Sequence, residues 1–372
     1  MIYKEILQDN LYLSAVGFGC GIGGYNTGIM NYKNLEVLIP RNIDLGCNFI
    51  DTAPVYGNGE SEKLIGRLIK TKREKVILAT KVSPNDTTYE GVMNSLESSL
   101  KRLQTDYVDL YQVHWPNPDV SLAETMLAME KLVVDGKVRY IGVSNFTLTE
   151  IKEAMNHLKN NSLASVQIEY NLFDRSIEEE LLPFARKHNI TIIAYSPLAQ
   201  GKLANGKRQI ELINDLAIKY DATPGQIVLR FLIDKPEVVV IPNTTKLNRL
   251  VENIHSTDLN IEPEDLDKID KVCRTKISSI DTKQIKVTNE YNREVYSTLE
   301  EAKANKMGMV PSPIELAAEI KCGEFLKPVR LRELSNQTSR KYYDLTGGRL
   351  RYWAWVIAFG WNKPIPSLVW EK

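Results

Sequence analysis

Four side chains that can hold or move protons follow three successive apolar segments of the sequence. Asp51 and Tyr56 lie at and just beyond the end of the first segment. Lys81 lies near the end of the second, and His114 ends the third. A buried Lys ammonium stabilises the phenolate of a neighbouring Tyr and lowers its pKa from about 10 toward neutral pH, while an Asp carboxylate keeps the Lys charged. With a neutral His to orient a carbonyl oxygen, the set predicts a proton donor for a carbonyl substrate.

Eight short apolar segments, which alternate with longer segments of helical period, must position these side chains. The short segments are residues 17–23, 48–53, 76–82, 107–114, 140–145, 165–171, 191–198 and 238–243. Apolar residues recur at helical spacing over residues 88–102, 123–134, 178–188 and 246–254. Eight β-then-α units predict an α/β fold in which a parallel sheet closes into a (β/α)8 TIM barrel. An open doubly wound sheet is the alternative.

Each of the four residues also has a purely structural interpretation. Asp51 alone is typical of a helix or turn cap, Lys81 of a solvated strand end, and Tyr56 of a packing residue. A single His114 is most often a core histidine whose hydrogen bonds are satisfied. Because the C-terminal ends of barrel strands share one mouth, three successive strand ends favour the catalytic interpretation of the set.

The segments that flank the eight units complete the predicted barrel domain, residues 1–278. Residues 1–13 are typical of a short hairpin before the first barrel strand. Residues 263–272, which begin with Pro, predict an extra helix after the eighth unit. Thr147 followed by Glu150 forms a capping-box pattern and predicts the start of another helix.

Around the four proton-handling residues the sequence resembles the aldo-keto reductase family, and the resemblance extends over residues 15–273. Residues 48–57 are similar to the family's segment around its catalytic Asp and Tyr. Residues 79–81 and 113–114 resemble its Lys and His sites. The order and the spacing of these motifs are both kept.

The resemblance implies a reaction and a role for each residue of the set. Tyr56 is the general acid, Lys81 and Asp51 tune it, and His114 orients the substrate carbonyl. The reaction is then the NADP(H)-dependent reduction of an aldehyde or ketone to an alcohol by hydride transfer. The substrate is a small carbonyl compound that the sequence does not identify further.

Further resemblance to the family implies a site for the nicotinamide cofactor. The residues implied to bind the nicotinamide and the pyrophosphate are Ser144, Asn145, Gln167, Tyr195, Ser196 and Leu198. The residues implied to bind the 2′-phosphate and the adenine are Thr244, Arg249, Glu252 and Asn253, with Arg249 as a charged fork. Asn243 stands at a position of this site where many members have Lys. NADP(H) is therefore favoured over NAD(H), but only modestly.

The glycine string at residues 19–24 also matches the dinucleotide pattern G-x-G-x-x-G, with Asp44 twenty residues beyond. In a Rossmann turn the helix opens at the glycines so that its N-terminus faces the pyrophosphate. Residues 25–31 are loop-like, and the following helix begins nearer Asn34. We therefore expect these glycines to allow close packing.

Composition excludes several classes of protein. The 372 residues are 43% apolar and carry 47 basic and 47 acidic side chains, so no net charge recruits a polyanion. The longest apolar run, residues 353–359, is too short to span a bilayer, and residues 1–5 lack a signal-peptide core. We therefore expect a cytoplasmic protein that does not bind membranes. Four Cys without a C-x-x-C pair predict reduced thiols, with no disulfide framework and no metal site.

The last part of the chain, residues 281–372, differs in composition. It carries 15 Lys and Arg against 11 Asp and Glu, a net charge of +4, and four of the five Trp lie in its last 20 residues. We predict a small α+β domain with strands near 284–288, 327–331 and 341–345 and helices near 299–305, 314–320 and 351–359. Residues 364–366, Pro-Ile-Pro, predict a strand at the edge of its sheet.

This second domain resembles the ParB/sulfiredoxin-like fold at residues 312–317, 323–329 and 343–354. The resemblance and the Gly-rich turn imply a nucleotide phosphate site made of Gly348, Arg349 and Arg351. Arg349 stands where sulfiredoxins have their reactive Cys, which argues against that chemistry. A structural role, in which Arg351 braces the fold, is the alternative. Nucleic-acid binding is disfavoured because the charge is small.

A regulatory function is the alternative to catalysis for the whole chain. In that hypothesis the barrel senses the redox state of a nicotinamide cofactor, and the second domain responds by binding a nucleotide or a partner. The fused second domain motivates it, whereas the complete set of four proton-handling residues favours an enzyme.

Overall fold

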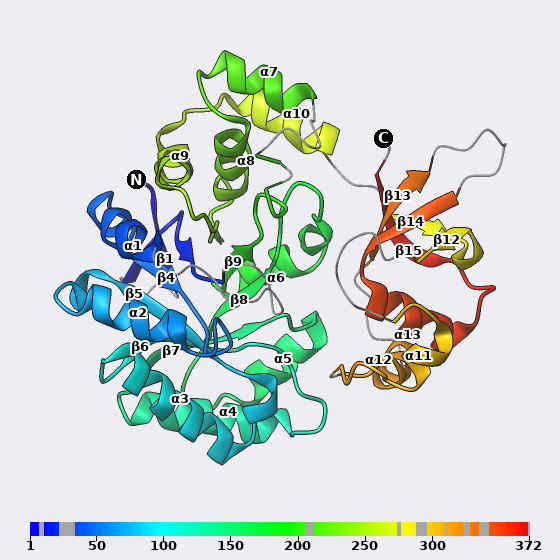
Figure 1. Cartoon of the computed structure of the whole chain (residues 1–372), viewed down its shortest axis with the longest axis horizontal. Helices are drawn as coiled ribbons and strands as arrows, with labels where there is room; N and C mark the ends of the chain where they lie inside the picture. The colour runs from blue at the N-terminus through cyan, green and yellow to red at the C-terminus, as the bar shows by residue number, and fades with distance from the viewer. Residues whose placement is uncertain are drawn as a thin grey trace. The chain divides into compact units, whose positions relative to one another are not determined.

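The structure, a computed structural model, forms two compact units, Met1–Arg274 and Thr275–Lys372 (Figure 1). It describes residues 1–6, 11–21, 34–201, 203–204, 211–273, 277–287, 296–309, 311–322, 328–334 and 342–370. The first unit ends at residue 274 rather than at the predicted 278, because residues 277–280 form a strand of the second unit's sheet.

The first unit is a closed barrel of eight parallel strands. The strands are β3 (Phe18–Gly19), β4 (Phe49–Asp51), β5 (Ile77–Val82), β6 (Val108–Val113), β7 (Val138–Ser144), β8 (Leu163–Glu169), β9 (Thr191–Tyr195) and β10 (Val238–Val240). Each strand pairs with the next in the sequence. Val16, just before β3, bridges Val240 of β10 in parallel and closes the ring. The eight predicted strands are confirmed, and the open-sheet alternative is wrong.

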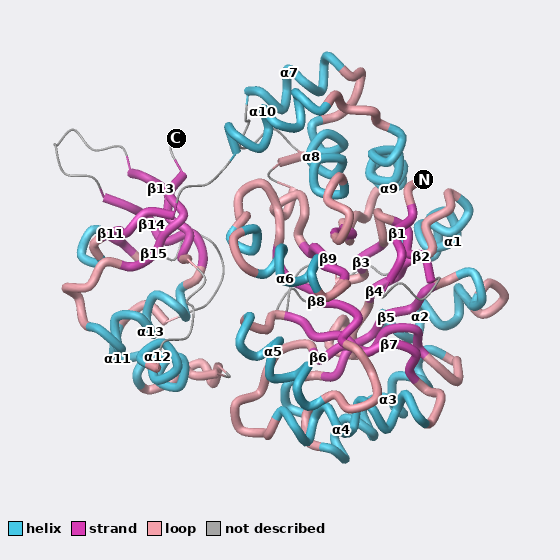
Figure 2. The backbone as a smooth tube through the Cα atoms, turned by 180° about the vertical axis from the view of Figure 1, so that it is seen from behind, coloured by secondary structure: helices cyan, strands magenta, loops and turns pink. Residues whose placement is uncertain are grey.

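Helices surround this barrel, as the view from behind shows (Figure 2). They are α1 (Leu35–Asp44), α2 (Glu60–Ile69), α3 (Tyr89–Leu103), α4 (Leu122–Val134), α5 (Leu148–His157), α6 (Leu181–Lys187), α7 (Glu211–Lys219), α8 (Pro224–Ile233), α9 (Leu247–His255) and α10 (Pro263–Cys273). The predicted capping box starts α5, with the Thr147 hydroxyl accepting from the Glu150 N–H and the Glu150 carboxylate accepting from the Thr147 N–H. The extra helix predicted after the eighth unit is α10.

The N-terminal end of the barrel is filled with apolar side chains and covered by the predicted hairpin. Strands β1 (Tyr3–Ile6) and β2 (Leu11–Ser14) pair antiparallel, and Leu13 joins the interior cluster that contains Phe49, Leu110 and Ile193. The Asn48 side chain fixes the hairpin to β4, because it donates to the Tyr12 carbonyl at 2.8 Å and accepts from the Ser14 N–H at 2.7 Å. The apolar core of the barrel therefore lies at this end, and functional residues are expected at the C-terminal ends of the strands.

The second unit is a five-stranded mixed sheet with helices on one side (Figure 1). Its elements are β11 (Ile277–Ile280), β12 (Ile285–Lys286), α11 (Leu299–Lys303), α12 (Pro313–Lys321), β13 (Val329–Leu334), β14 (Tyr342–Gly347), α13 (Arg349–Phe359) and β15 (Ile365–Trp370). The predicted edge position of the last strand is wrong. β15 lies between β11, its antiparallel neighbour, and β13, its parallel neighbour. Residues 323–327, part of the predicted motifs, lie outside the described residues.

The second unit has a core of its own, which includes Leu331, Leu345, Tyr352 and Trp353. The Trp353 indole donates to the Tyr296 carbonyl at 2.8 Å.

Among the described residues of the whole chain, no helix has both the length and the apolar character needed to cross a membrane. All four Cys are free thiols.

A buried carboxylate fixes the loop between α5 and β8. Oε1 of Glu130, on α4, accepts hydrogen bonds from the backbone N–H groups of Lys159, Asn160 and Asn161 at 2.9, 2.7 and 3.1 Å. Burial by itself would raise the pKa of Glu130, but the hydrogen bonds from Asn160 and Asn161 outweigh it and lower the pKa. The folded state therefore stabilises the ionised form of the Glu130 carboxylate more than the unfolded chain does.

We expect Glu130→Ala to destabilise the barrel by about 1–3 kcal/mol at pH 7, because it removes the acceptor shared by three backbone N–H groups. A depressed folded pKa contributes stability above the unfolded value of about 4.3, and this is lost as pH falls through the folded value. The difference between wild type and Glu130→Gln should therefore shrink at acid pH. Urea unfolding followed by circular dichroism measures both, with the exposed Glu153→Gln as control. Equal losses of unfolding free energy in Glu130→Gln and Glu153→Gln would contradict the role assigned to Glu130.

Candidate active site

The four predicted proton-handling residues meet at the C-terminal mouth of the barrel. Asp51 ends β4, Lys81 lies on β5, and His114 directly follows β6. Tyr56 lies in the turn between β4 and α2. Asp51, Lys81 and His114 are removed from water, with 1%, 0% and 5% exposure, whereas Tyr56 is partly exposed.

The Lys81 ammonium is the centre of the cluster. Its Nζ donates to Asp51 Oδ1 at 2.6 Å, to the Thr52 carbonyl at 2.9 Å and to the Tyr56 hydroxyl at 3.4 Å. An ammonium has three N–H donors, and these three acceptors match them. The rings of Tyr56 and His114 meet edge to face, with centroids 5.9 Å apart. Carboxylate, ammonium, phenol and imidazole therefore form one continuous chain of contacts.

The turn that carries Tyr56 is held from two sides. The hydroxyl groups of Thr52 and Ser61, at the two ends of the turn, lie 2.8 Å apart. On the other side Gly21 lies against the phenol, since a Cβ at this position would be only 2.9 Å from Tyr56 Cζ. A larger residue at position 21 would therefore displace the ring.

The electrostatics of the cluster correct one prediction. Burial raises the pKa of Tyr56 above its ordinary 10.0, and the charge of Lys81 opposes this only in part. The predicted lowering of the Tyr56 pKa is therefore wrong, because the loss of solvation outweighs the nearby charge. Burial by itself would lower the pKa of Lys81, but Asp51 and Tyr56 outweigh it and raise the pKa. At neutral pH Lys81 is a cation and Tyr56 keeps its proton.

His114 is a neutral imidazole in this environment. Burial, and then the nearby charge of Lys81, bring the pKa of His114 well below 6.5. Its backbone N–H donates to the Val82 carbonyl at 3.0 Å, which ties the end of β6 to β5. A neutral imidazole carries one N–H donor and one acceptor nitrogen.

The second oxygen of Asp51 is held by two glutamine amides. Asp51 Oδ2 accepts from Gln112 Nε2 at 3.1 Å and from Gln167 Nε2 at 2.8 Å. The sequence motifs did not indicate Gln112, and they implied Gln167 only as a cofactor residue. The signal was present, because Gln112 lies two positions before His114 on a strand whose alternate residues face the barrel interior.

The predicted nicotinamide residues form part of the rim of the mouth. Asn145 donates to the His114 carbonyl at 3.1 Å and to Ser144 Oγ at 3.0 Å. Its Oδ1 accepts from the Tyr195 hydroxyl at 2.9 Å, so its amide links β6, β7 and β9. Asn145 has a φ of +64°, a left-handed conformation that Asn tolerates better than most residues.

Ser196 and Leu198 lie in the tight turn that follows β9. Ser196 has a φ of +49°, and its carbonyl accepts from Asn171 Nδ2 at 3.2 Å. The Leu198 carbonyl accepts from the Gly201 N–H at 3.0 Å. The structure thus places both residues beside Tyr195, in a turn fixed by backbone hydrogen bonds.

The predicted phosphate and adenine residues lie around the start of α9. Thr244 Oγ1 accepts from the Lys246 N–H at 3.1 Å, and Arg249 Nη1 contacts Glu252 Oε2 at 2.7 Å. The Arg249 side chain remains 35% exposed, whereas Asn253 is buried. The cation of Arg249 and the hydroxyl of Thr244 thus come from the first turn of α9 and the segment just before it.

Asn243 has a structural contact that the sequence did not indicate. Its Nδ2 donates to the Gly19 carbonyl at 2.7 Å and so joins the end of β10 to the end of β3. Gly19 packs closely at the same seam, since a Cβ there would lie 2.8 Å from the Ile241 carbonyl oxygen. Close packing of this glycine agrees with the prediction, while residues 22–24 of the string lie outside the described residues. Asp44 lies on the surface, paired with Lys72 at 2.6 Å.

In the second unit, the predicted phosphate residues lie at the start of α13. Gly348 precedes the helix with a φ of +82°, and Arg349 is buried. Arg351 donates to the Pro328 carbonyl at 3.0 Å, which braces the helix start against β13. Nucleotide binding at this turn stays a prediction.

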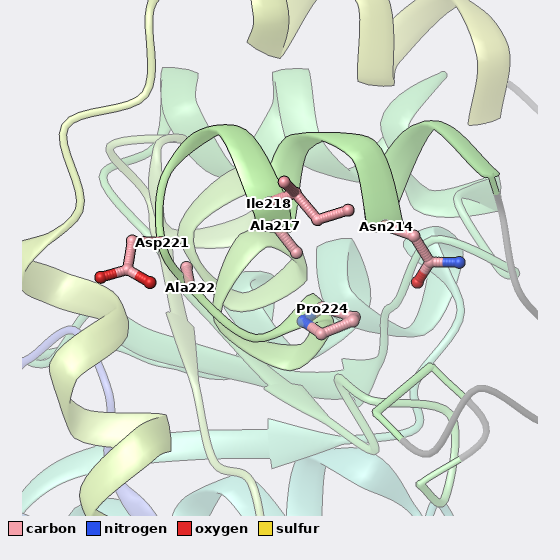
Figure 3. A pocket seen from close by; sticks show the side chains of 6 residues that line it. All are labelled: Asn214, Ala217, Ile218, Asp221, Ala222 and Pro224. Atoms are coloured by element: carbon pink, nitrogen blue, oxygen red, sulfur yellow. The ribbon is translucent and has the colours of Figure 1, made fainter.

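A hollow of 460 Å³ lies on the outside of the barrel and contains none of the four proton-handling residues. Its lining residues, on α7 and the turn into α8, are Asn214, Ala217, Ile218, Asp221, Ala222 and Pro224 (Figure 3). Across the described ranges, no three His, Cys, Asp or Glu side chains gather as a metal site would require.

Comparison with known proteins finds relatives of the barrel. A sequence model of the aldo/keto reductase family matches residues 16–274. The chain is 35% identical to the methylglyoxal reductase YeaE of Escherichia coli (strain K12) over 266 residues, which are 71% of this chain and 92% of that protein. It is 34% identical to the glyoxal reductase of Bacillus subtilis (strain 168) over 253 residues, 68% of this chain and 87% of that protein.

Solved structures agree with the sequence matches. The aldo/keto reductase of Klebsiella pneumoniae, solved in complex with NADP and acetate, is 34% identical and has a TM-score of 0.63. The match covers 70% of this chain and 92% of that chain. The similarity to all these proteins lies in the barrel, since the family match ends at residue 274.

The environment of His114 predicts that its imidazole stays neutral at pH 6.5 and above and titrates only at more acidic pH. Burial and the Lys81 charge both oppose protonation. Carbon-13 NMR of labelled histidine measures the titration, with the His114→Gln variant to assign the resonance. A midpoint at or above pH 6.5 would contradict the described environment.

Proposed function

Since this chain belongs to the aldo/keto reductase family, an oxidoreductase family, we propose that it uses NADPH to reduce a small aldehyde or ketone to the alcohol. In the balanced reaction, the carbonyl compound, NADPH and one proton give the alcohol and NADP⁺. The observation that carries the proposal is the contact of the Lys81 ammonium with the Tyr56 hydroxyl, beside the neutral ring of His114. In this proposal Tyr56 is the proton donor and His114 the orienting group, and both act on the same carbonyl oxygen.

The roles of the four side chains follow from their contacts. Tyr56 keeps its proton at neutral pH and gives it to the carbonyl oxygen as the carbon is reduced. The Lys81 ammonium, held by Asp51 at 2.6 Å, stabilises the phenolate that remains. His114, neutral and adjacent to Tyr56, holds the carbonyl oxygen by a hydrogen bond. Aqueous protonation afterwards restores the phenol.

The residues at the mouth fit a nicotinamide dinucleotide phosphate. When bound, NADPH supplies the hydrogen and the electron pair that reduce the carbonyl carbon. Ser144 and Gln167 would hold the carboxamide, and the half-buried ring of Tyr195 would flank the nicotinamide. Arg249, exposed by about a third, would hold the 2′-phosphate with Thr244. The donor set suits the cofactor by its chemistry, because amides can hydrogen-bond a carboxamide, an aromatic ring can flank the nicotinamide and a guanidinium can pair with a phosphate.

The substrate we favour is a small 2-oxoaldehyde. Two relatives of the barrel, at 35% and 34% identity, are a methylglyoxal reductase and a glyoxal reductase. Trp115, which directly follows His114, is 38% exposed and offers an apolar surface to such a substrate. A regulatory role as a redox sensor stays a prediction, and the complete proton-handling cluster favours catalysis.

Replacement of Tyr56 by Phe removes the proton donor and keeps the ring. We expect the rate of methylglyoxal reduction to fall by roughly 10²- to 10⁴-fold, the usual contribution of a general acid, while NADPH binding is unchanged. Loss of nicotinamide absorbance gives the rate, and fluorescence titration gives the cofactor Kd. The exposed Tyr12→Phe variant is the control. Full activity of Tyr56→Phe would refute the proposed role.

The Arg249→Ala variant tests the cofactor assignment. A charge-assisted hydrogen bond contributes about 1.5–3 kcal/mol, so we expect the KM for NADPH to rise roughly 10- to 100-fold with little change in kcat. The KM for NADH, which lacks the 2′-phosphate, should stay within about twofold. Arg186→Ala, at an exposed ion pair with Glu237, is the matched control. Equal losses with both cofactors would contradict a phosphate contact.

A further inference from the structure

We propose that Gln112 is a positioning residue of this active site, which holds the Asp51 carboxylate so that the Lys81 ammonium stays directed at Tyr56. The inference rests on the proposed function, because it assigns a role to a residue behind the proposed proton donor. Nothing in the family motifs of the sequence assigns a role to Gln112.

The hydrogen bonds of Asp51 define what Gln112 does. Oδ1 accepts from Lys81, and Oδ2 accepts from the amides of Gln112 and Gln167. Each oxygen has its own donors on a different side, so the carboxylate cannot turn without loss of at least one hydrogen bond. Gln112 thus fixes the orientation in which Oδ1 meets the ammonium.

The arrangement is built into the strand register. Lys81 of β5 pairs in register with Gln112 of β6, and Gln112 pairs with Gly142 of β7. A Cβ on Gly142 would lie 2.9 Å from Gln112 Cγ and 2.4 Å from Ser165 Oγ. The missing side chain on β7 therefore leaves the room in which the Gln112 side chain lies. Bulky branched residues usually fill such interior layers of barrels, whereas this layer is polar.

Burial makes the hydrogen bond from Gln112 important. Gln112 and Lys81 are 0% exposed, Asp51 1% and Gln167 3%, so water cannot replace a missing donor. A buried carboxylate with fewer donors binds a proton more readily, so the charged Asp51–Lys81 pair becomes less stable relative to a neutral pair, and the carboxylate is also less fixed in orientation. Without Gln112 the Lys81 charge is less well stabilised, and the Tyr56 phenolate in turn loses part of its counter-charge.

Gln112 and Gln167 differ in what else they are expected to touch. Gln167, at the end of β8, is also a proposed carboxamide ligand, whereas Gln112 has no proposed contact with the cofactor. A change at Gln112 should therefore affect kcat and its pH dependence without affecting cofactor affinity. The titratable groups that face Asp51 and Lys81 are Tyr56, Cys20 after β3 and His114 after β6.

The test compares Gln112→Leu, similar in volume but without a donor, with the isosteric Gln112→Glu. For Gln112→Leu we expect kcat to fall about tenfold, the effect of one hydrogen bond to a charged group, with NADPH Kd within about twofold of wild type. The apparent pKa for alcohol oxidation, which needs the phenolate, should rise by about one unit. An ultraviolet titration of the cofactor-free protein, with the Tyr56→Phe titration subtracted, should show the same rise.

The isosteric variant gives an independent readout if Gln112→Leu folds poorly. A protonated Glu at position 112 can still donate to Asp51, whereas an ionised one repels it. We therefore expect Gln112→Glu to keep near wild-type kcat on the acid side and to lose it as pH rises. Ser165→Ala is the matched control, because it alters a polar atom beside Gly142 without a hydrogen bond to Asp51. Its pH profile should match wild type.

The outcomes separate the two claims. If Tyr56→Phe is inactive while both Gln112 variants share the wild-type kcat and pH profile, this inference fails and the proposed function stands. If Tyr56→Phe keeps full activity, the proposed function itself fails. An equal loss in Ser165→Ala and Gln112→Leu would also overturn the inference, since it would point to general packing of the layer.

Discussion

The fully buried ammonium of Lys81 is the constraint on which the mouth of the barrel depends. Removal of an ammonium from water costs several kcal/mol even in a real protein, so its three donors must all find acceptors. Asp51, the Thr52 carbonyl and Tyr56 are those acceptors. Two glutamine amides satisfy the other oxygen of the carboxylate. The cost of burial is thereby offset, and the charge is kept beside the Tyr56 phenol, the proposed proton donor.

Such a cluster requires strands that cannot shift relative to one another. The residues concerned come from β4, β5, β6 and β8, and a slip of one residue would turn each side chain away from the interior. Hydrogen bonds join neighbouring strand ends all around the mouth. The pairs are Asn243–Gly19, Cys20–Asp51, Thr52–Ala79, His114–Val82, Asn145–His114, Asn145–Gln167 and Asn171–Ser196. Apolar side chains fill the opposite end, where Leu13 of the hairpin completes the cluster. The barrel thus separates its stabilising core from its polar layer along one axis.

The second unit does not share this division. Its core is aromatic, and the indoles of Trp353 and Trp355 donate to the carbonyls of Tyr296 and Lys363. The family match ends where this unit begins, so the reductase residues all belong to the barrel. At the start of α13, Arg351 is hydrogen-bonded to the Pro328 carbonyl just before β13.

The sequence by itself determined the eight strands, the capping box at Thr147 and the positions of the four proton-handling residues. These follow from local patterns, because the alternation of short apolar segments with segments of helical period, and the motifs at strand ends, can be recognised from neighbouring residues alone. Only the tertiary structure decided that Gln112 holds Asp51. That contact joins residues 61 positions apart, and it exists only once the strands close into a ring. It also decided the direction of the Tyr56 pKa, because the loss of solvation depends on what surrounds the ring in space rather than on its neighbours in the chain.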